Sequence, residues 1–353
     1  MLFRFTRLAL LLFALLPSFL MTSNSQSRPG SQSGAGIVGV GAYVPERVLT
    51  NEDLARLIET SDEWIVSRTG IRARRIAAKD EGCVDLAENA ARRALQDARM
   101  SPDQLDMIIV ATCTPDYQFP STASLLQNRL GAHCGAFDLE AACSGFVYGL
   151  ANAVGLVKSG LMRTVLVVGS EVMSRVVDWS DRNTAVLFGD GAGAAVISSV
   201  PEGRGFEAFD LGSDGSGGEL LKIETCALTA QPDGGSGSRR VVQNGREVYK
   251  FAVHAMGESA SRALQKLGLG GDDVNVFVPH QANIRIIESA AKRISVPMEK
   301  VFVNVQKYGN TSAASIPIAL AEAREAGRIK EGDRVVTVGF GAGLTWASAV
   351  MVW

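Results

Sequence analysis

The sequence has few of the residues that build metal centres and disulfide frameworks. It contains three histidines and five cysteines in 353 residues, and no two cysteines stand in a C-x-x-C arrangement. The odd cysteine count and the lack of paired Cys/His spacing argue against a disulfide-stapled domain and against a structural zinc site. We therefore expect reduced thiols and no metal.

An excess of charge of either sign is missing as well. With 35 basic and 37 acidic residues the formal net charge is −2, so the composition gives no support for nucleic-acid binding. A G-x-S-x-G serine elbow and the paired carboxylates of glycosidases are also absent. At 46% hydrophobic residues, the chain can bury a large core, which is typical of a globular α/β protein with two domains or halves.

The first 45 residues contain no aspartate or glutamate. Two arginines precede an apolar run at 8–16, a form typical of a signal or transit peptide, and the run is too short to span a membrane comfortably. No A-x-A cleavage site follows, and Met21 is an alternative start. We interpret 1–35 as an N-terminal extension, either signal-like or an over-long start. We expect a cytoplasmic protein without membrane association, and a plastid or other organelle is the alternative if the extension is a targeting peptide.

The stretch at 138–150 places a cysteine between a predicted strand and a predicted helix. After Cys143, apolar residues recur at helical spacing from Phe146 onward. Because the N-terminus of a helix favours negative charge, this position predicts a nucleophilic thiolate near neutral pH. For the residue taken alone, a buried and inert thiol is the alternative.

The sequence repeats itself at an offset of about 169 residues, which indicates two diverged copies of one α/β unit. The matching segments are 93–96 with 262–265, 105–109 with 274–278, 164–169 with 335–339, and 191–193 with 341–343. We expect the first half at 36–203 and the second at 204–353. The first half carries Cys143.

The repeat predicts that polar residues from both halves meet. His280 follows the predicted strand at 274–278, and Asn310 precedes a predicted helix at 313–327. Sites in open α/β sheets form at the carboxyl ends of strands, so packing about a pseudo-twofold axis would bring both residues to Cys143. Taken alone, a histidine on an apolar strand such as His280 is more commonly a satisfied core residue. Asn310 taken alone is equally consistent with a helix cap.

Two further patterns each allow a structural and a functional interpretation. The run Gly189–Ala194 matches the dinucleotide fingerprint G-x-G-x-x-A, but 195–200 is predicted as a strand and the fingerprint requires a helix. We expect a tight strand-to-strand turn there that lets backbones approach closely. Arg68 and Arg182 belong to a scattered set of arginines that is either a solvated face or, with Trp64, a site for phosphate and adenine.

The order of Cys143, His280 and Asn310, with their surroundings, resembles the β-ketoacyl-acyl-carrier-protein synthase III family of the thiolase superfamily. The motifs that carry the resemblance are TSDEWI at 60–65, RTGI at 68–71, AACSG at 141–145, FGDGAG at 188–193, VPHQAN at 278–283, GNTSAASIP at 309–317 and GFGAG at 339–343. The resemblance runs from about residue 36 to the C-terminus. It implies a thiolase-like α/β fold whose two pseudo-symmetric halves form a layered αβαβα arrangement.

The resemblance implies an acyltransferase that initiates fatty-acid synthesis. Cys143 would take the acyl group of a short acyl-CoA, expected to be acetyl-CoA, and condense it with malonyl-acyl-carrier protein, with loss of CO2. His280 and Asn310 would hydrogen-bond the malonyl thioester carbonyl, and no metal or redox cofactor would be needed. A thiolase-superfamily acyltransferase of a secondary-metabolite pathway is the alternative.

The same resemblance implies roles for residues around the reaction centre. Backbone N–H groups of Cys143 and of Gly341, Ala342 and Gly343 would form an oxyanion hole. Ala342 departs from the glycine usual in the family, and an alanine would be strained if the turn required a positive φ. Phe119 would reach across a homodimer interface into the acyl pocket of the partner subunit.

The substrates are assigned in the same way. For coenzyme A, the residues are Trp64 and Arg182 at the adenine, Arg68 at the phosphates, and Gly245 and Asn283 at the pantetheine arm. For the acidic carrier protein, they are Lys250, Gln281 and Arg285.

Overall fold

Apolar, β-branched runs form the first sheet, as the sequence predicts. The computed structural model describes residues 34–223 and 240–353, so nearly all of the expected extension at 1–35 lies outside the described residues. The sheet has five strands in the order β1 (Gly34–Tyr43), β7 (Asp190–Val200), β6 (Thr164–Val172), β4 (Met107–Ala111) and β5 (Gly135–Leu139). The three inner strands are almost completely buried, because helices cover both faces of the sheet.

The second sheet repeats this arrangement. Its order is β8 (Gly205–Ser213), β13 (Thr345–Val352), β12 (Arg334–Gly341) and β11 (Val276–Pro279). In both sheets the first three strands are antiparallel and the third pairs in parallel with the fourth. At the position in the second sheet that corresponds to β5 in the first, there is a single parallel β-bridge between Phe277 and Val301. The weak sequence repeat therefore corresponds to two sheets with the same order and direction of strands.

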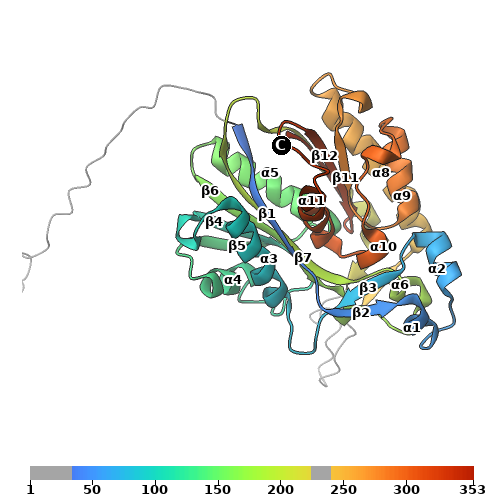
Figure 1. Cartoon of the computed structure of the whole chain (residues 1–353). Helices are drawn as coiled ribbons and strands as arrows, with labels where there is room; N and C mark the ends of the chain where they lie inside the picture. Colours follow the sequence, from blue (N-terminus) through green and yellow to red (C-terminus); the bar gives the residue numbers. More distant parts are fainter. Residues whose placement is uncertain (1–33, 224–239) are drawn as a thin grey trace, which may run out of the picture. The chain divides into compact units, whose positions relative to one another are not determined.

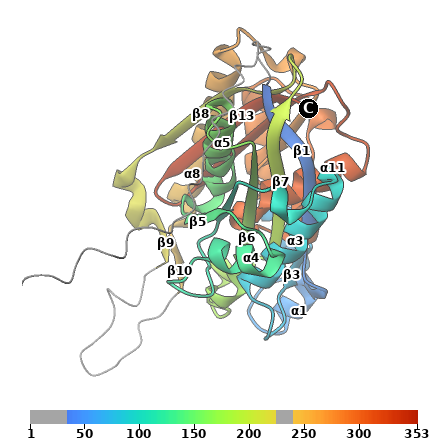
Figure 2. The same ribbon diagram turned by 90° about the vertical axis from the view of Figure 1, so that its left-hand side faces the viewer.

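Helices form three layers around the two sheets (Figures 1 and 2). The outer face of the first sheet carries α3 (Cys83–Ala98) and α4 (Thr122–Leu130), and the outer face of the second carries α8 (Gly245–Gln265) and α9 (Ile284–Arg293). Between the sheets lie α5 (Gly145–Lys158) and α11 (Ser315–Glu325). The predicted αβαβα layering is confirmed.

The two central helices hold the halves together. Phe146 and Leu150 of α5 and Ile316 and Leu320 of α11 belong to one buried apolar cluster that includes residues of both sheets. Helices that contact sheets on two sides must be apolar on more than one face, which explains why the sequence after Cys143 is so rich in apolar residues.

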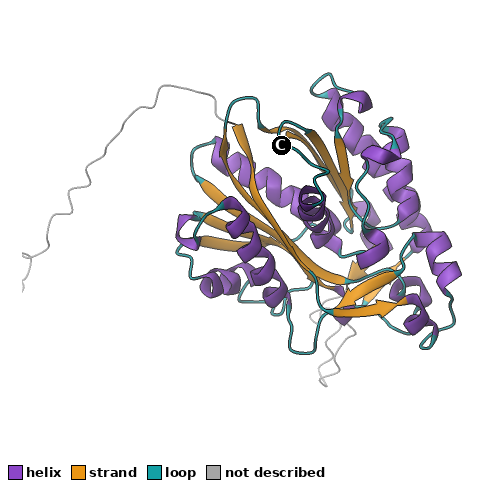
Figure 3. Cartoon of the chain, in the orientation of Figure 1, coloured by secondary structure: helices purple, strands orange, loops and turns teal. Residues whose placement is uncertain are grey.

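Short elements surround the ends of these layers (Figure 3). They are β2 (Arg47–Thr50), α1 (Asn51–Ala55), α2 (Asp62–Thr69), β3 (Ala73–Ile76), α6 (Arg182–Ala185), β9 (Leu221–Ile223), β10 (Val241–Gln243) and α10 (Val305–Tyr308). The side chains of Thr50 and Ser61 cap α1 and α2 by accepting backbone N–H groups. Gly70, with a φ of 78°, ends α2 in the left-handed conformation that favours glycine.

The expected turn at Gly189–Ala194 is wrong. Residues 190–194 belong to β7 and pair with β6 without interruption, and 192–194 also pair with β1. A Cβ atom on Gly193 would lie 2.6 Å from the backbone nitrogen of Ile318. The expected close approach of backbones is confirmed, since β7 lies against the backbone of α11, but the chain does not turn at these glycines.

No helix within 34–223 or 240–353 is long and apolar enough to cross a bilayer. The apolar run at 8–16 lies outside the described residues.

Candidate active site

Cys143 lies in a single 3₁₀ turn, Ala142–Ser144, between β5 and α5. Ala142 has a φ of 46°, in the left-handed region that strains residues with a Cβ atom. The second half contains the same device: the turn Ser312–Ala314 precedes α11, and Ser312 has a φ of 49°. The counterpart of Cys143 in this second turn is Ala313, so the two halves share a backbone geometry but carry only one thiol.

A strand glycine of the opposite half packs against each turn. A Cβ atom on Gly339 would lie 3.2 Å from the carbonyl oxygen of Cys143, and one on Gly169 would lie 2.3 Å from that of Ala313. A Cβ atom on Gly341 would lie 2.6 Å from the backbone nitrogen of Cys143. The position of the thiol is thus fixed by both halves of the molecule.

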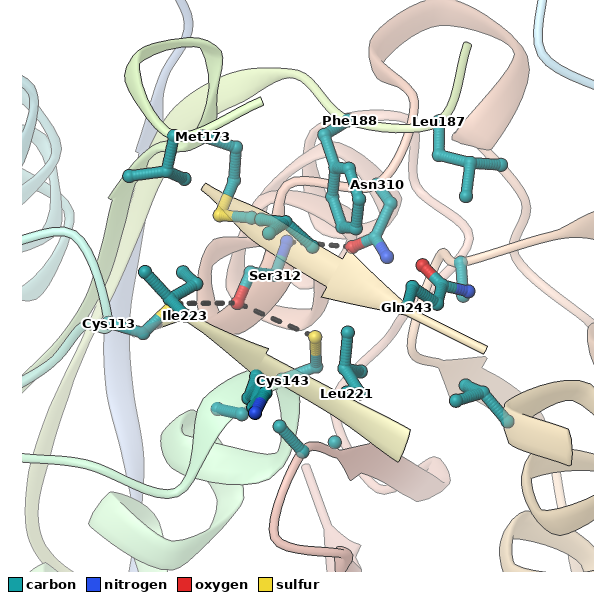
Figure 4. Close-up of a pocket in the computed structure, with 18 of the residues that line it drawn as sticks. Cys113, Cys143, Met173, Leu187, Phe188, Leu221, Ile223, Gln243, Asn310 and Ser312 are labelled. Atoms are coloured by element: carbon teal, nitrogen blue, oxygen red, sulfur yellow. Dashed lines mark hydrogen bonds between the residues drawn. The ribbon is translucent and has the colours of Figure 1, made fainter. Parts of the chain in front are cut away.

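A cavity of about 1360 Å³ extends from Cys143. Residues of β9 and β10, among them Leu221, Ile223 and Val241, form an apolar part of its wall, and Trp64 and Arg68 of α2 also line it. Figure 4 shows β9 and β10 passing over the site, with Cys143 and Asn310 beneath them. A cavity with an apolar wall and a few convergent polar groups suits a ligand with a long flexible arm.

The prediction that Cys143 is a thiolate near neutral pH is wrong. Burial, with smaller contributions from Glu171 and Glu140, raises the pKa of the Cys143 thiol to about 12. The thiol donates a hydrogen bond to Ser312 Oγ at 3.5 Å, which opposes this shift. Desolvation therefore outweighs the helix N-terminus, because the strained turn holds the sulfur in a buried wall.

His280 lies at the end of β11, and its ring is fully buried. Its Nδ1 lies 2.5 Å from Ser315 Oγ, which already accepts the N–H of Gln281. We therefore assign the Ser315 proton to Nδ1 and the ring proton to Nε2, which has no hydrogen-bond partner among the described residues. Since burial lowers the pKa of His280 to about 3, the ring is a neutral donor beside the cavity that it lines.

Asn310 is held by three hydrogen bonds. Its backbone pairs with Leu187 and Gly189, and its Oδ1 accepts the N–H of Ser312 at 2.8 Å. The Nδ2 group is thereby turned away from Ser312, as Figure 4 shows. Asn310, His280 and Cys143 all line the same cavity, as the sequence predicts, and two of them present N–H donors.

The turn Gly341–Gly343 is tied to the cysteine turn. Thr345 Oγ1 lies within 3.1 Å of the carbonyl oxygens of Ala141 and Ala342. Ala342 does not have a positive φ, whereas Gly343 has a φ of 134°. The strain expected for an alanine at 342 is therefore absent, because the glycine conformation falls on the next residue.

Trp64 and the two arginines expected at coenzyme A come together. The guanidinium carbons of Arg68 and Arg182 lie 4.6 Å and 4.7 Å from the centre of the Trp64 indole. Gly245 and Asn283 both line the cavity, and Asn283 donates to the Arg68 carbonyl oxygen at 3.0 Å. Trp64 and Arg68 offer an aromatic and a cationic group at one part of the cavity wall, whereas Arg182 contacts Trp64 but does not line the cavity.

The expected carrier-protein contacts differ in their exposure. Lys250 is exposed and pairs with Glu247, and Arg285 is exposed and donates to the carbonyl oxygen of Ser67. Gln281 is only 1% exposed, and its amide is used by the backbone of Pro279 and Asn304. The expectation for Gln281 is therefore wrong: its side chain holds the loop after His280 and does not reach the surface.

Phe119 is 83% exposed in this single chain and does not line the cavity. Its expected contact with a partner subunit stays a prediction.

Two residues of the site were not identified from the sequence. Ser312 donates from its hydroxyl to Glu171 at 2.9 Å while accepting from Cys143. Glu171 is fully buried at the end of β6. The available signal was the carboxylate itself, since an acidic residue near the end of a predicted buried strand is rarely buried without a partner.

Two family models match the chain. The model of 3-oxoacyl-[acyl-carrier-protein] synthase III matches residues 137–215, and that of its C-terminal part matches 264–353. A β-ketoacyl-[acyl-carrier-protein] synthase III of Geobacillus kaustophilus is 53% identical over 321 residues, which cover 91% of this chain and 99% of the relative. One of Desulfitobacterium hafniense is 52% identical over 330 residues, covering 90% and 97%.

Solved structures show the same similarity. A synthase III of this kind from Thermus thermophilus has a TM-score of 0.86 and 54% identity, covering 90% of this chain and 99% of that one. One from Aquifex aeolicus has a TM-score of 0.86 and 47% identity, covering 91% and 100%. A priming β-ketosynthase of a polyketide pathway has a TM-score of 0.85 and 37% identity, covering 92% and 98%.

Proposed function

Because the chain belongs to the β-ketoacyl-acyl-carrier-protein synthase III family, we propose that Cys143, His280 and Asn310 carry out its reaction. The chain is an acyltransferase that condenses a short acyl-CoA with malonyl-acyl-carrier protein, with loss of CO2, and so initiates fatty-acid synthesis. We propose acetyl-CoA as the primer, with no metal or redox cofactor.

In the first step, the sulfur of Cys143 attacks the thioester carbonyl of the acyl-CoA, and coenzyme A leaves. Negative charge develops on the carbonyl oxygen in the transition state. The backbone N–H groups of Cys143 and of the Gly341–Gly343 turn stabilise it. The close approach of Gly341 to the backbone nitrogen of Cys143 supports this role, because a Cβ atom on Gly341 would lie only 2.6 Å from that nitrogen.

In the second step, malonyl-acyl-carrier protein binds in the same cavity. His280 Nε2 and Asn310 Nδ2 donate to its thioester carbonyl, and this stabilises the enolate that forms as CO2 leaves. The enolate carbon attacks the acyl-cysteine, the bond from the acyl carbon to the sulfur breaks, and the 3-oxoacyl product leaves. Cys143 is released as a thiolate, and a proton from solvent restores the thiol. The observation that supports this step best is the set of hydrogen bonds to His280 and Asn310. These bonds occupy His280 Nδ1 and Asn310 Oδ1, so that the N–H groups at Nε2 and Nδ2 are left to donate into the cavity.

We propose further that the protein is a cytoplasmic homodimer. The exposed side chains of Tyr117 and Phe119 support a partner contact on that loop, since exposed aromatic groups are typical of interfaces. Lys250 and Arg285 are proposed contacts of the acidic carrier protein.

The function is tested by incubating the full chain with a panel of acyl-CoA primers and malonyl-acyl-carrier protein. We expect CO2 release and a 3-oxoacyl-carrier product, with acetyl-CoA the best primer. Acylation of the protein without CO2 release would contradict the proposal and favour a secondary-metabolite acyltransferase. If only longer or branched primers are used, the proposed reaction stands but the proposal of acetyl-CoA as the primer is overturned.

The proposed coenzyme A site predicts the effect of Trp64→Ala. We expect the KM for acetyl-CoA to rise about tenfold, because stacking of a base on an aromatic ring contributes roughly 1–3 kcal/mol. The kcat should change little, since the ring binds ground state and transition state alike. Steady-state kinetics measures both values. Trp353→Ala is the matched control, because this half-buried indole does not line the cavity, and an equal rise in KM for both variants would contradict the assignment.

A further inference from the structure

Glu171 is a fully buried carboxylate that the two steps above do not use. Its oxygens accept from the hydroxyls of Thr114 at 2.5 Å, Ser312 at 2.9 Å and Thr112 at 3.2 Å. They also accept from the backbone N–H and the thiol of Cys113. Within the described residues Glu171 forms no ion pair. A carboxylate this rich in donors is held in one orientation, although burial raises its pKa.

Ser312 connects this carboxylate to the reacting thiol. Its hydroxyl oxygen accepts a hydrogen bond from Cys143 Sγ at 3.5 Å, and its O–H donates a hydrogen bond to Glu171 Oε1 at 2.9 Å. Figure 4 shows Ser312 Oγ between the sulfurs of Cys113 and Cys143. The backbone of Ser312 is fixed as well, since its N–H bonds to Asn310 and its φ is positive. The hydroxyl therefore lies in a continuous chain of hydrogen bonds from sulfur to carboxylate.

The first step requires somewhere for the thiol proton to go. In the tautomer assigned above, His280 does not receive it at the cavity, because Nε2 carries the ring proton and Nδ1 accepts from Ser315. Asn310 presents only a donor. Among the groups described around Cys143, the Ser312 hydroxyl is the hydrogen-bond acceptor for the thiol, and Glu171 lies behind it.

We propose that Glu171 takes up the proton of Cys143 through the hydroxyl of Ser312 during acyl transfer. Glu171 touches no substrate and is a positioning residue that acts through Ser312. As the bond from sulfur to the acyl carbon forms, the Cys143 proton passes to Ser312 Oγ and the Ser312 proton passes to Glu171. As the bond from the acyl carbon to the coenzyme A sulfur breaks, the same chain runs backwards and protonates the departing thiolate. Products are acyl-enzyme and coenzyme A thiol, so atoms and charge balance.

The proposal rests on the proposed function of Cys143, but a measurement without substrate tests it. The probe is iodoacetamide, and the measured quantity is the rate of alkylation at Cys143, followed by peptide mapping so that Cys113 is counted separately. Glu171→Gln keeps the size of the side chain and its hydroxyl partners but cannot take up a proton. Ser312→Ala leaves the carboxylate in place and removes only the link.

We expect both variants to alkylate Cys143 at least tenfold more slowly than wild type near neutral pH. A purely electrostatic role predicts the opposite sign for Glu171→Gln, because the negative charge of Glu171 raises the pKa of Cys143. Across the pH profile the variant rate should rise in proportion to hydroxide, as for an isolated buried thiol, and the wild-type rate less steeply. The other titratable groups facing the pair, Cys83, Cys113 and Glu140, are the same in all proteins compared.

Asp190→Asn is the matched control. Asp190 is also a buried carboxylate, at the start of β7, but its partners are Ala77 and Ser174 and not the thiol. We expect its alkylation rate to stay within about twofold of wild type, with thermal unfolding recording any shared loss of stability. Unchanged or faster alkylation in Glu171→Gln and Ser312→Ala would overturn the relay. If alkylation follows the relay but acetyl-CoA leaves Cys143 unmodified, the proposed function fails and the relay stands.

Discussion

Cys143→Ser is expected to lower the rate of condensation at least about a thousandfold, as removal of a reaction's nucleophile does elsewhere. The serine hydroxyl fits the same turn and can still donate to Ser312, so the fold and the cavity should be retained. It is a far weaker nucleophile than sulfur at neutral pH. Steady-state condensation assays measure the loss, and intact-mass analysis with acetyl-CoA should show one acetyl group on wild type and none on the variant.

The matched control for this prediction is Cys83→Ser. Cys83 is a second fully buried thiol in the first half, but it bonds to Thr112 and Ser170 and does not line the cavity. We expect this variant to be acetylated at the wild-type rate. An acetyl group mapped to Cys113, or retained in Cys143→Ser, would contradict the assignment of the acyl carrier.

The second large effect is expected when either N–H donor of the second step is removed. His280→Ala and Asn310→Ala should each lower CO2 release from malonyl-acyl-carrier protein by about 10²- to 10³-fold, the cost of losing one oxyanion donor. Acetylation of Cys143 should persist, because neither side chain donates to or accepts from the thiol. Measuring the two half-reactions separately on each variant therefore locates the loss.

Two conservative variants test whether the donors themselves matter. Asn310→Asp keeps an oxygen for the N–H of Ser312 but replaces the Nδ2 donor by an oxygen that repels the enolate, so it should be at least as slow as Asn310→Ala. His280→Gln can place an amide N–H near the position of Nε2 and should recover part of the loss. Equal activity in Asn310→Asp and wild type, or loss of acetylation in both alanine variants, would contradict the assigned roles.

The sequence predicts the strands and central helices well because they are continuous apolar runs whose environment does not depend on distant details. The repeat also brings Cys143, His280 and Asn310 together, since equivalent strands and turns must occupy equivalent places in two similar halves. Properties that depend on tertiary packing cannot be predicted from the sequence pattern in this way. The pKa of the Cys143 thiol depends on how deeply the turn at Ala142 buries the sulfur. The sequence does not predict that burial, because no local pattern indicates a positive φ at an alanine.

Residues that act through others are the hardest to find from sequence. The resemblance implies that Gln281 contacts the carrier protein, whereas its buried amide hydrogen-bonds the backbone of the loop after His280. Glu171 lies 28 residues after Cys143 along the chain and meets it only through Ser312 of the other half. No local pattern records such a contact, because it exists only once the two halves have packed.

The pair of strained turns shows how one duplicated backbone came to serve two purposes. Two identical turns with two thiols would make two equal reaction centres facing each other. With alanine at position 313, the second turn no longer delivers a nucleophile, and its N–H and hydroxyl at Ser312 instead hold Asn310 and the thiol of the first turn. The two halves therefore share one backbone scaffold but differ in their chemistry. The glycines that pack against the Cys143 turn, Gly339 and Gly341, belong to the second half, and Gly169, which packs against the Ala313 turn, belongs to the first.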